Sequence, residues 1–390
     1  MTFHISKVLS VSALSLALIS GIAAQTPAPA GQTPAPAASP APTPAPAPAA
    51  SPAPEWSVGP IDFSGLIDGY YDVNFNHPAS GVNGYRNFDV KADQFQLNMA
   101  KVTLNHDPDP VGFRMDLGFG RAFDMVHSSE QAPDIFRYLE QAYIEYKPAK
   151  AKGLQLDFGE FVTSAGAEVI ETYSNWNYSR SLLFAWALPY YHFGLRATIP
   201  VGSHFTGGVQ LVNGWNNVDD NNSGKTVGLV GAFNTKKFTW SNNYYVGPEN
   251  SGTNTGLRQL YDTTLLLTPT DKASFYINYD YGADNRPVVG KGHWDGIAGA
   301  ARFQLNKTWA IAQRLEWFND ATGFSTGTVQ KLKEFTFTTE YKAAEGLLVR
   351  GEYRHDWSNV DAFDRGNQLA NWKNQDTLLV GFVAYFGPKR

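Results

Sequence analysis

Residues 61–75 read IDFSGLIDGYYDVNF. Apolar or small side chains occupy the odd positions, whereas polar side chains, three of them aspartates, occupy most of the even positions. Successive side chains of a β-strand point to opposite faces. This period of two therefore predicts a strand with one apolar and one polar face.

The same period recurs along the chain, for example in residues 111–120, 309–317 and 347–356. The connections alternate in length. Short turns are expected at residues 106–110, 147–153, 200–203, 234–237, 269–272, 306–307 and 342–346, and long polar loops at 76–92, 121–136, 162–188, 215–224, 248–255, 283–292, 319–331 and 358–373. This pattern predicts an all-β, antiparallel transmembrane barrel of about sixteen strands with short periplasmic turns. A slip in the alternation near Met99–Val102 indicates a β-bulge.

Alternation alone would also suit a soluble β-sandwich, so the aromatic residues decide between the two folds. They are concentrated at the ends of the predicted strands: Phe63, Tyr71, Phe75, Phe119, Phe161, Phe205, Trp215, Phe238, Tyr244, Phe275, Tyr281, Trp309, Trp317 and Trp357. Rings at both strand ends form the two girdles that lie at the level of the lipid headgroups. We therefore assign residues 56–390 to an outer-membrane β-barrel.

Two segments precede the predicted barrel. Residues 1–24 have the features of a secretory signal peptide, with Lys7, an apolar run over 8–19 and small residues before the cleavage site. Residues 25–55 are rich in proline and alanine, which predicts a disordered periplasmic linker. The linker either contacts the cell wall through residues 25–54 or has no partner. We expect the exported, processed protein in the outer membrane of a Gram-negative bacterium.

Composition and motifs exclude several classes of protein. The chain has no cysteine and a formal net charge of −5, which argues against thiolate metal sites and against nucleic acid as a partner. No HExxH, GxSxG or Walker motif occurs, so we expect no catalytic residue, no metal, no cofactor and no enzymatic activity. Residues 219–222 (Asp-Asp-Asn-Asn) offer oxygen ligands for calcium, but a solvated turn explains them equally well.

A barrel of this size is too wide to be filled by its own side chains and should leave a water-filled channel. The residues predicted to line it are charged: Asp68, Asp72, Arg114, Asp116, Arg196, Arg302, Arg314, Glu316, Arg350, Glu352 and Arg354. They predict a porin for passive diffusion of small polar solutes or ions. The alternative for each residue is pairing with a neighbour, with little effect on selectivity. Arg314, Arg350 and Arg354 are expected on consecutive strands as one basic patch.

The longest connection, residues 162–188, is expected to fold into the lumen and narrow it, because loops of this length are uncommon unless they have a function. Glu168, Glu171 and Arg180 would then face the solute. Tyr173, Trp176 and Tyr178 would offer stacking surfaces. The alternative is a cap that packs over the outer rim.

Four segments carry a resemblance to a known family: residues 65–71, 175–181, 189–196 and 212–222. Through them the chain resembles the putative β-barrel porin-2, OmpL-like group of bacterial outer-membrane proteins, over about residues 60 to 387. The resemblance implies passive uptake of small polar solutes and points to no particular solute.

The strongest rival function is a structural envelope tether. Under that hypothesis the barrel is a plugged anchor, and the Pro/Ala arm contacts the cell wall. An active receptor is disfavoured, because such barrels need about 22 strands and a globular plug before the barrel. The expected partners are outer-membrane lipid and small polar solutes or ions, and the protein is expected to be a monomer or a homotrimer.

Overall fold

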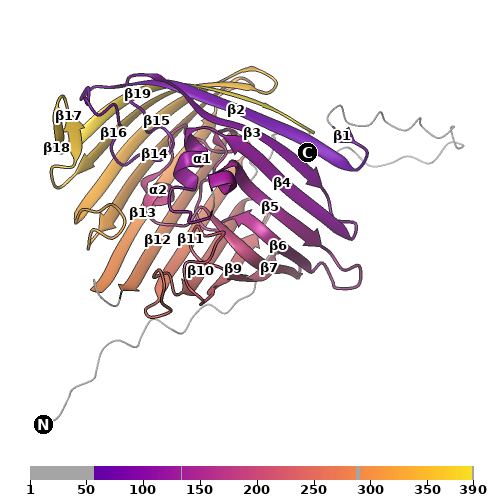
Figure 1. Ribbon diagram of the computed structural model, residues 1–390. Coiled ribbons are helices and arrows are strands. Elements are labelled where there is room, and N and C mark those ends of the chain that lie inside the picture. Colours follow the sequence, from indigo (N-terminus) through magenta and orange to yellow (C-terminus); the bar gives the residue numbers. More distant parts are fainter. Residues whose placement is uncertain (1–56, 133, 287–289, 389–390) are drawn as a thin grey trace, which may run out of the picture.

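The computed structural model describes residues 57–132, 134–286 and 290–388. The predicted signal peptide (1–24) and linker (25–55) lie outside these residues. Sixteen antiparallel strands form a closed barrel (Figure 1). They are β2 (Ile61–Asn74), β3 (Phe95–His106), β4 (Val111–Phe119), β5 (Leu139–Tyr146), β6 (Gln155–Val162), β7 (Tyr191–Val201), β8 (Phe205–Val212), β9 (Thr226–Asn234), β10 (Phe238–Gly247), β11 (Arg258–Thr270), β12 (Ala273–Arg286), β13 (Gly290–Gln304), β14 (Trp309–Asp320), β15 (Gln330–Ala344), β16 (Leu347–Ser358) and β19 (Asn374–Phe386).

Every barrel strand is hydrogen-bonded to its neighbours in sequence, and the last strand, β19, closes the ring on β2, with Val73 opposite Leu378. A two-residue strand, β1 (Ser57–Val58), extends the pairing at the start of β2. Closure leaves no barrel strand with an unpaired edge, which is the condition for crossing hydrocarbon with strands. The predicted fold class and strand number are confirmed.

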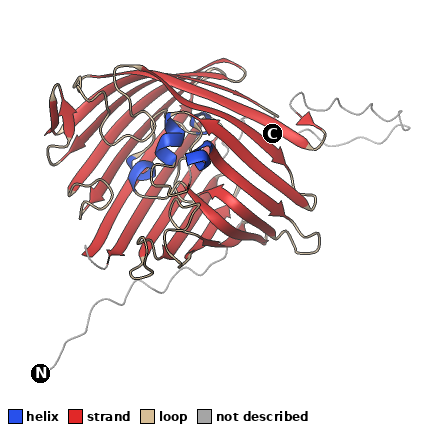
Figure 2. Ribbon diagram, in the orientation of Figure 1, coloured by secondary structure: helices blue, strands red, loops and turns tan. Residues whose placement is uncertain are grey.

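The remaining elements are short and belong to the connections. They are α1 (Arg121–Val126), η1 (Asp134–Tyr138), η2 (Thr172–Ser174), α2 (Leu182–Trp186) and the hairpin of β17 (Phe363–Arg365) and β18 (Gln368–Trp372). Figure 2 shows the helices, in blue, surrounded by barrel strands. Among the described residues, no helix has the length and apolarity needed to span a bilayer.

The two faces of the strands differ as the alternation predicts. Outward-facing apolar side chains are exposed on the wall; Leu315 is 58% exposed and Phe382 53% exposed. Arg314 and Glu316, the sequence neighbours of Leu315, are buried inside the barrel. A wide apolar surface exposed to water would be unfavourable, so this belt is the face that meets lipid.

The predicted connections agree with the strand boundaries, with one exception. The bounds expected for the loop at 283–292 are wrong: β12 extends to Arg286 and β13 begins at Gly290, with Ala283 opposite His293 and Arg286 opposite Gly290. Beyond the membrane both faces of a hairpin meet water. The alternation of apolar and polar residues therefore ends there, although the hydrogen bonding between the strands continues, and the sequence pattern placed the loop too early. The bulge lies at Asn98, just before the predicted range, where Asp68 pairs with Met99 and the next residue with Leu97.

Two aromatic residues assigned to the girdles point inward instead. Phe161 is fully buried, because it lies four residues from Asp157 on the inward face of β6, where Arg196 lies over its ring. Gly159 and Gly194 face each other on β6 and β7 with φ values of 135° and 157°. A Cβ on Gly159 would lie 2.1 Å from a carbonyl oxygen of β5. Trp215 packs edge-on against Trp294, with ring centroids 6.1 Å apart.

The barrel interior is filled by connections rather than by strand side chains alone. Two buried apolar clusters join loop residues to the inner wall. One contains Phe88, Phe184 and Tyr190, and the other contains Leu183 and Trp294. The interior is therefore built mainly from the loops after β2 and β6.

An arginine on the lipid face tests this orientation. We expect Leu315→Arg to destabilise the folded barrel by about 2–4 kcal/mol, because the side chain lies mid-strand and outward. Urea unfolding in lipid vesicles, followed by the heat-modifiable shift on gels, measures the effect. Ser251→Arg, in an exposed outer loop, should be neutral. Equal stability of both variants would contradict a lipid-facing Leu315.

Candidate functional site

The loop between β6 and β7, residues 163–190 (the inserted loop), contacts the inner wall on opposite sides of the barrel. Its Gly166 amide donates to Asp262 of β11 over 3.0 Å. Asn177 donates to Thr338 of β15 over 2.7 Å. Thr172 donates to Asp68 of β2. These contacts place the loop inside the ring of strands and not over its rim.

Arginine side chains of the wall accept no hydrogen bond and offer five donors, so they suit the bare carbonyl groups of the inserted loop. Arg350 donates to the carbonyl oxygens of Thr172 (2.7 Å) and Asn175 (2.6 Å). Arg314 donates to the carbonyl oxygen of Ser179 over 2.9 Å. Buried backbone carbonyls need partners, and here charged side chains supply them.

The predicted basic patch of Arg314, Arg350 and Arg354 is wrong. Arg314 lies on β14 and the other two on β16, so β15 runs between them. Glu334 and Glu340 of β15 neutralise the group. Arg314 pairs with Glu334 at 2.8 Å, and Arg350 pairs with Glu340 at 2.6 Å. Strand β15 carries Glu340 directly opposite Arg350, and Glu334 two residues from Thr336, which lies opposite both Arg314 and Arg354. The alternation of the other two strands could not reveal these carboxylates.

Carboxylates on the wall bind the amide groups of the same loop. Glu352 accepts from the backbone amides of Tyr178 (2.6 Å) and Ser179 (2.9 Å). Glu316 accepts from the amide of Leu182. The carboxylates thus bind backbone amide groups of the inserted loop, and the arginines bind its backbone carbonyl groups.

A third group of charges fixes the loop near η2. Lys101 of β3 lies 3.2 Å from Asp116 and 2.9 Å from Glu140, and it also pairs with Glu171. The three carboxylates could ligate a cation, since their oxygens lie within 4.8 Å of one another. The ammonium group already lies among them. Burial favours the neutral form of Glu171, but Lys101 and Arg114 outweigh it and hold its pKa below the usual value.

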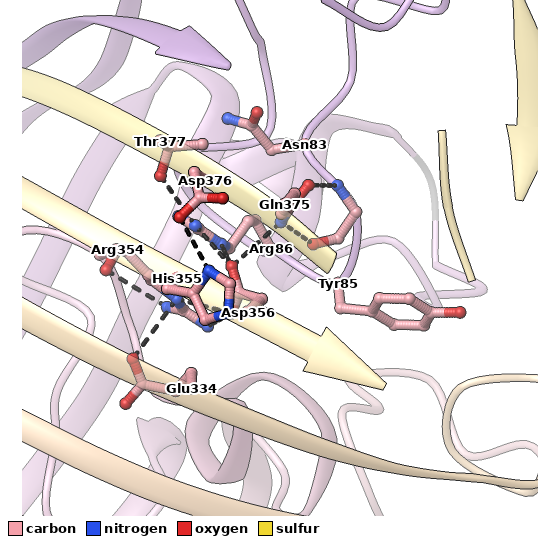
Figure 3. A network of polar contacts seen from close by, with 12 residues as sticks. Asn83, Tyr85, Arg86, Glu334, Arg354, His355, Asp356, Gln375, Asp376 and Thr377 are labelled. Atoms are coloured by element: carbon pink, nitrogen blue, oxygen red, sulfur yellow. Dashed lines mark hydrogen bonds and ion pairs between the residues drawn. The ribbon is translucent and has the colours of Figure 1, made fainter. Parts of the chain in front are cut away.

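The loop between β2 and β3 covers a neighbouring part of the wall. Figure 3 shows Arg86 of this loop directed at Asp356 of β16. Its guanidinium lies 2.7 Å from Asp356, pairs with Asp89 and donates to Thr377 over 3.0 Å. Asn83 of the same loop donates to Asp72. Two wall carboxylates are thus enclosed by the loop.

The predicted lumen residues fall into two groups. Eight are buried under the loops: Asp68, Asp72, Asp116, Arg314, Glu316, Arg350, Glu352 and Arg354. Three remain partly exposed: Arg114, Arg196 and Arg302. A role in lining a channel stays a prediction, and the partly exposed arginines are the ones a solute could reach.

The residues predicted on the inserted loop also divide. Glu168, Tyr178 and Arg180 are buried, so they do not face a solute as expected. Arg180 donates to the carbonyl of Val169 over 3.0 Å, and Tyr178 donates to Asp68 over 2.6 Å. A loop inside the barrel has few water molecules to bind its polar groups, and these side chains serve that purpose.

The other three loop residues are less enclosed. Glu171 and Trp176 are partly buried, and Tyr173 is exposed at its edge, where it stacks on Tyr385 with ring centroids 5.0 Å apart. Whether they contact a solute stays a prediction.

Sequence reasoning missed Lys101, Arg86 and Arg258. Lys101 could have been found from its charge within the run Met99–Val102, but the bulge hides which face it occupies. Arg86 lies in a loop without any period, so no pattern marks it. Arg258 begins β11 and pairs with Asp284 at 2.7 Å.

Partly exposed ion pairs of the wall share an asymmetry. The exposed fractions of the arginine and carboxylate side chains are 26% and 0% for Arg114–Asp116, 12% and 1% for Arg196–Asp157, 18% and 1% for Arg258–Asp284, and 25% and 13% for Arg302–Glu340. In these four pairs the cation is the more accessible partner, whereas in Arg350–Glu340 the carboxylate is, with exposed fractions of 1% and 13%.

The closed barrel, its apolar belt and its charged interior define the fold of an outer-membrane porin. The family described as putative beta-barrel porin-2, OmpL-like, matches residues 60–386, and the chain belongs to this family. No match to a curated protein is found.

Solved structures share the fold at low sequence identity. An anion-selective porin from Comamonas acidovorans matches with a TM-score of 0.55 and 10% identity, covering 84% of this chain and 99% of that one. OmpT of Vibrio cholerae, in its trimer form, matches with a TM-score of 0.54 and 13% identity, over 84% and 99%. The outer-membrane channel DcaP of Acinetobacter baumannii gives 0.52 and 11%, over 84% and 97%.

The anchoring of the inserted loop can be tested with two arginines that share one partner. Arg350 and Arg302 both pair with Glu340, but only Arg350 also donates to the loop carbonyls. We expect Arg350→Met to accelerate chymotrypsin cleavage within residues 163–190 at least about tenfold, because charged hydrogen bonds are lost. Arg302→Met should leave cleavage unchanged. Similar rates in both variants would show that Arg350 does not hold the loop.

Proposed function

We propose that the protein forms a water-filled outer-membrane channel for passive diffusion of small polar solutes, without a chemical step, and that it favours anions. The observation that carries the proposal is the greater exposure of the arginine in four ion pairs of the wall, Arg114–Asp116, Arg196–Asp157, Arg258–Asp284 and Arg302–Glu340. Arg114, Arg196 and Arg302, all predicted to line the lumen, are three of these arginines.

The electrostatic argument follows from position. A buried carboxylate behind an accessible guanidinium leaves a surface whose nearest charge to the solute is positive, and rings of such charges select anions. Glu145, a partly exposed carboxylate on the same wall, accepts from Gln155 over 3.1 Å and opposes this field. We therefore expect a modest preference.

The comparisons support related proposals. The similarity to an anion-selective porin agrees with the charge argument, although at 10% identity it shows the fold alone. OmpT of Vibrio cholerae, folded in vitro, has been solved in a trimer form, and on that basis we propose a homotrimer in preference to a monomer. Export with removal of residues 1–24 is part of the same proposal.

Ion selectivity tests the function directly. Single-channel recordings of refolded protein in a planar bilayer, under a salt gradient, should show stable open steps and a reversal potential of the sign for anions. Replacing Arg114, Arg196 and Arg302 by glutamine should shift the reversal potential towards cations. Replacing Lys236, Lys237 and Lys307, exposed in periplasmic turns, removes the same charge and should not shift it. An equal shift in both variants would contradict the assigned lining.

Acid should loosen the inserted loop. The folded-state pKa of Glu171 is lowered, so its pairing with Lys101 contributes stability above the ordinary glutamate pKa of about 4.3. That contribution is lost as the pH falls through the lowered value. We expect current fluctuations of the open channel to increase as the pH falls below the ordinary glutamate pKa.

The variant Glu171→Gln should show these fluctuations already at pH 7 and respond less to acid. Glu345→Gln, in an exposed periplasmic turn, serves as the control and should behave like the unmodified protein. A pH response identical in Glu171→Gln and the unmodified protein would remove Glu171 as its source.

The rival tether function is favoured by one observation, the enclosure of eight wall charges by the loops. Correctly folded barrels that carry no current would favour a plugged anchor. Deletion of residues 25–54 then separates the two functions, because a channel would still conduct and a tether would lose its attachment to cell wall.

A further inference from the structure

Three exposed lysines lie near the extracellular ends of β15 and β19: Lys331 and Lys333, which face outward on either side of the buried Leu332, and Lys373, in the bend just before β19. Among the described residues, no ion pair or side-chain hydrogen bond engages their ammonium groups. In contrast, Lys225, just before β9, pairs with Asp220. We call the three lysines, with Trp317 and Trp357, the lysine patch.

The strand register places the lysine patch at the outer boundary of the membrane. Lys333 pairs across the sheet with Trp317 on one side and Trp357 on the other. Trp309, eight residues before Trp317, pairs with Tyr341 in the opposite aromatic row. Eight residues of strand span about 26 Å along the strand, or roughly 20 Å of height at a tilt of about 40°, which approaches the apolar band of about 25 Å. Lys333 therefore lies in the row of rings at the headgroups.

The three lysines are close enough to act on one headgroup. Lys331 and Lys333 share a face two residues apart, about 7 Å along the strand. The carbonyls of Lys331 and Lys373 accept from Asn359 (3.3 Å) and Ser358 (2.7 Å), so these lysines flank the end of β16 at about two strand spacings, or roughly 10 Å. Long lysine side chains can close this gap.

Two strand carboxylates near the lysine patch, Asp376 and Asp295, are engaged by neighbouring side chains. Asp376 lies 2.8 Å from His355 and accepts from the hydroxyl of Tyr353 over 2.6 Å (Figure 3 shows Asp376 beside His355). Asp295, two strands away from β15, accepts from Asn319 over 2.8 Å. Among these groups, the unengaged charge is therefore positive.

We propose that the lysine patch binds the phosphate groups of the glycolipid in the outer leaflet of the outer membrane. The ammonium groups meet the phosphates, and the two tryptophan rings pack against the sugar and the upper part of the acyl chains. The site is on the outside of the wall, so it does not depend on whether the lumen conducts.

Binding of bisphosphorylated lipid A to the full-length refolded protein tests the proposal. We expect simultaneous replacement of Lys331, Lys333 and Lys373 by glutamine to weaken binding at least about tenfold in native mass spectrometry titrations. The matched control replaces Lys236, Lys237 and Lys307, exposed in periplasmic turns, and should retain the affinity. The heat-modifiable gel shift verifies that each variant is folded.

Two further probes separate the possible sources of phosphate. Lipid A without phosphates should bind the unmodified protein at least about tenfold more weakly, and inorganic phosphate at the lipid concentration should not displace bound lipid. Equal affinity of the lysine variant and the unmodified protein would overturn the proposal. Equal loss in the control, or displacement by inorganic phosphate, would also overturn it, by showing a nonspecific charge effect or a site for free anions.

Discussion

The need to pair every backbone amide and carbonyl away from water governs this structure. Strands in hydrocarbon meet that need only as a closed ring, and the pairing of β19 with β2 completes the ring. The constraint returns inside the barrel, where the inserted loop crosses from wall to wall. There the loop cannot use strand pairing, and charged side chains of the wall provide its partners instead.

This arrangement explains why so many charges lie inside and so few are accessible. Arg350 and Glu352 bind opposite ends of the backbone dipoles of one loop segment. Lys101 holds the same loop through an ion pair with the carboxylate of Glu171. A charge that holds a loop is no longer available to a solute. The selectivity of the proposed channel would therefore depend on the remaining arginines, such as Arg302, whose side chain is 25% exposed.

The outer wall of the barrel contacts a different environment at each depth of the membrane. Apolar side chains such as Leu315 meet the acyl chains, and the row of Trp317, Lys333 and Trp357 meets the headgroups. The inner charges act on whatever passes through the barrel, and the outer charges act on the membrane that surrounds it. The two sets share strands but not partners.

The period of two determined the strands and their two faces, because alternation is a local property of each strand, and the aromatic residues at the strand ends pointed to a membrane barrel in place of a soluble sandwich. It also marked the long connection 162–188. The tertiary structure alone decided which charges the loops cover and that β15 inserts Glu334 between Arg314 and Arg354. It alone decided that Arg86 reaches Asp356, 270 residues away. Contacts of loops depend on the course of the loop backbone, which no sequence period reveals. Ion pairs between neighbouring strands depend on the register of two strands, which the alternation within one strand does not contain.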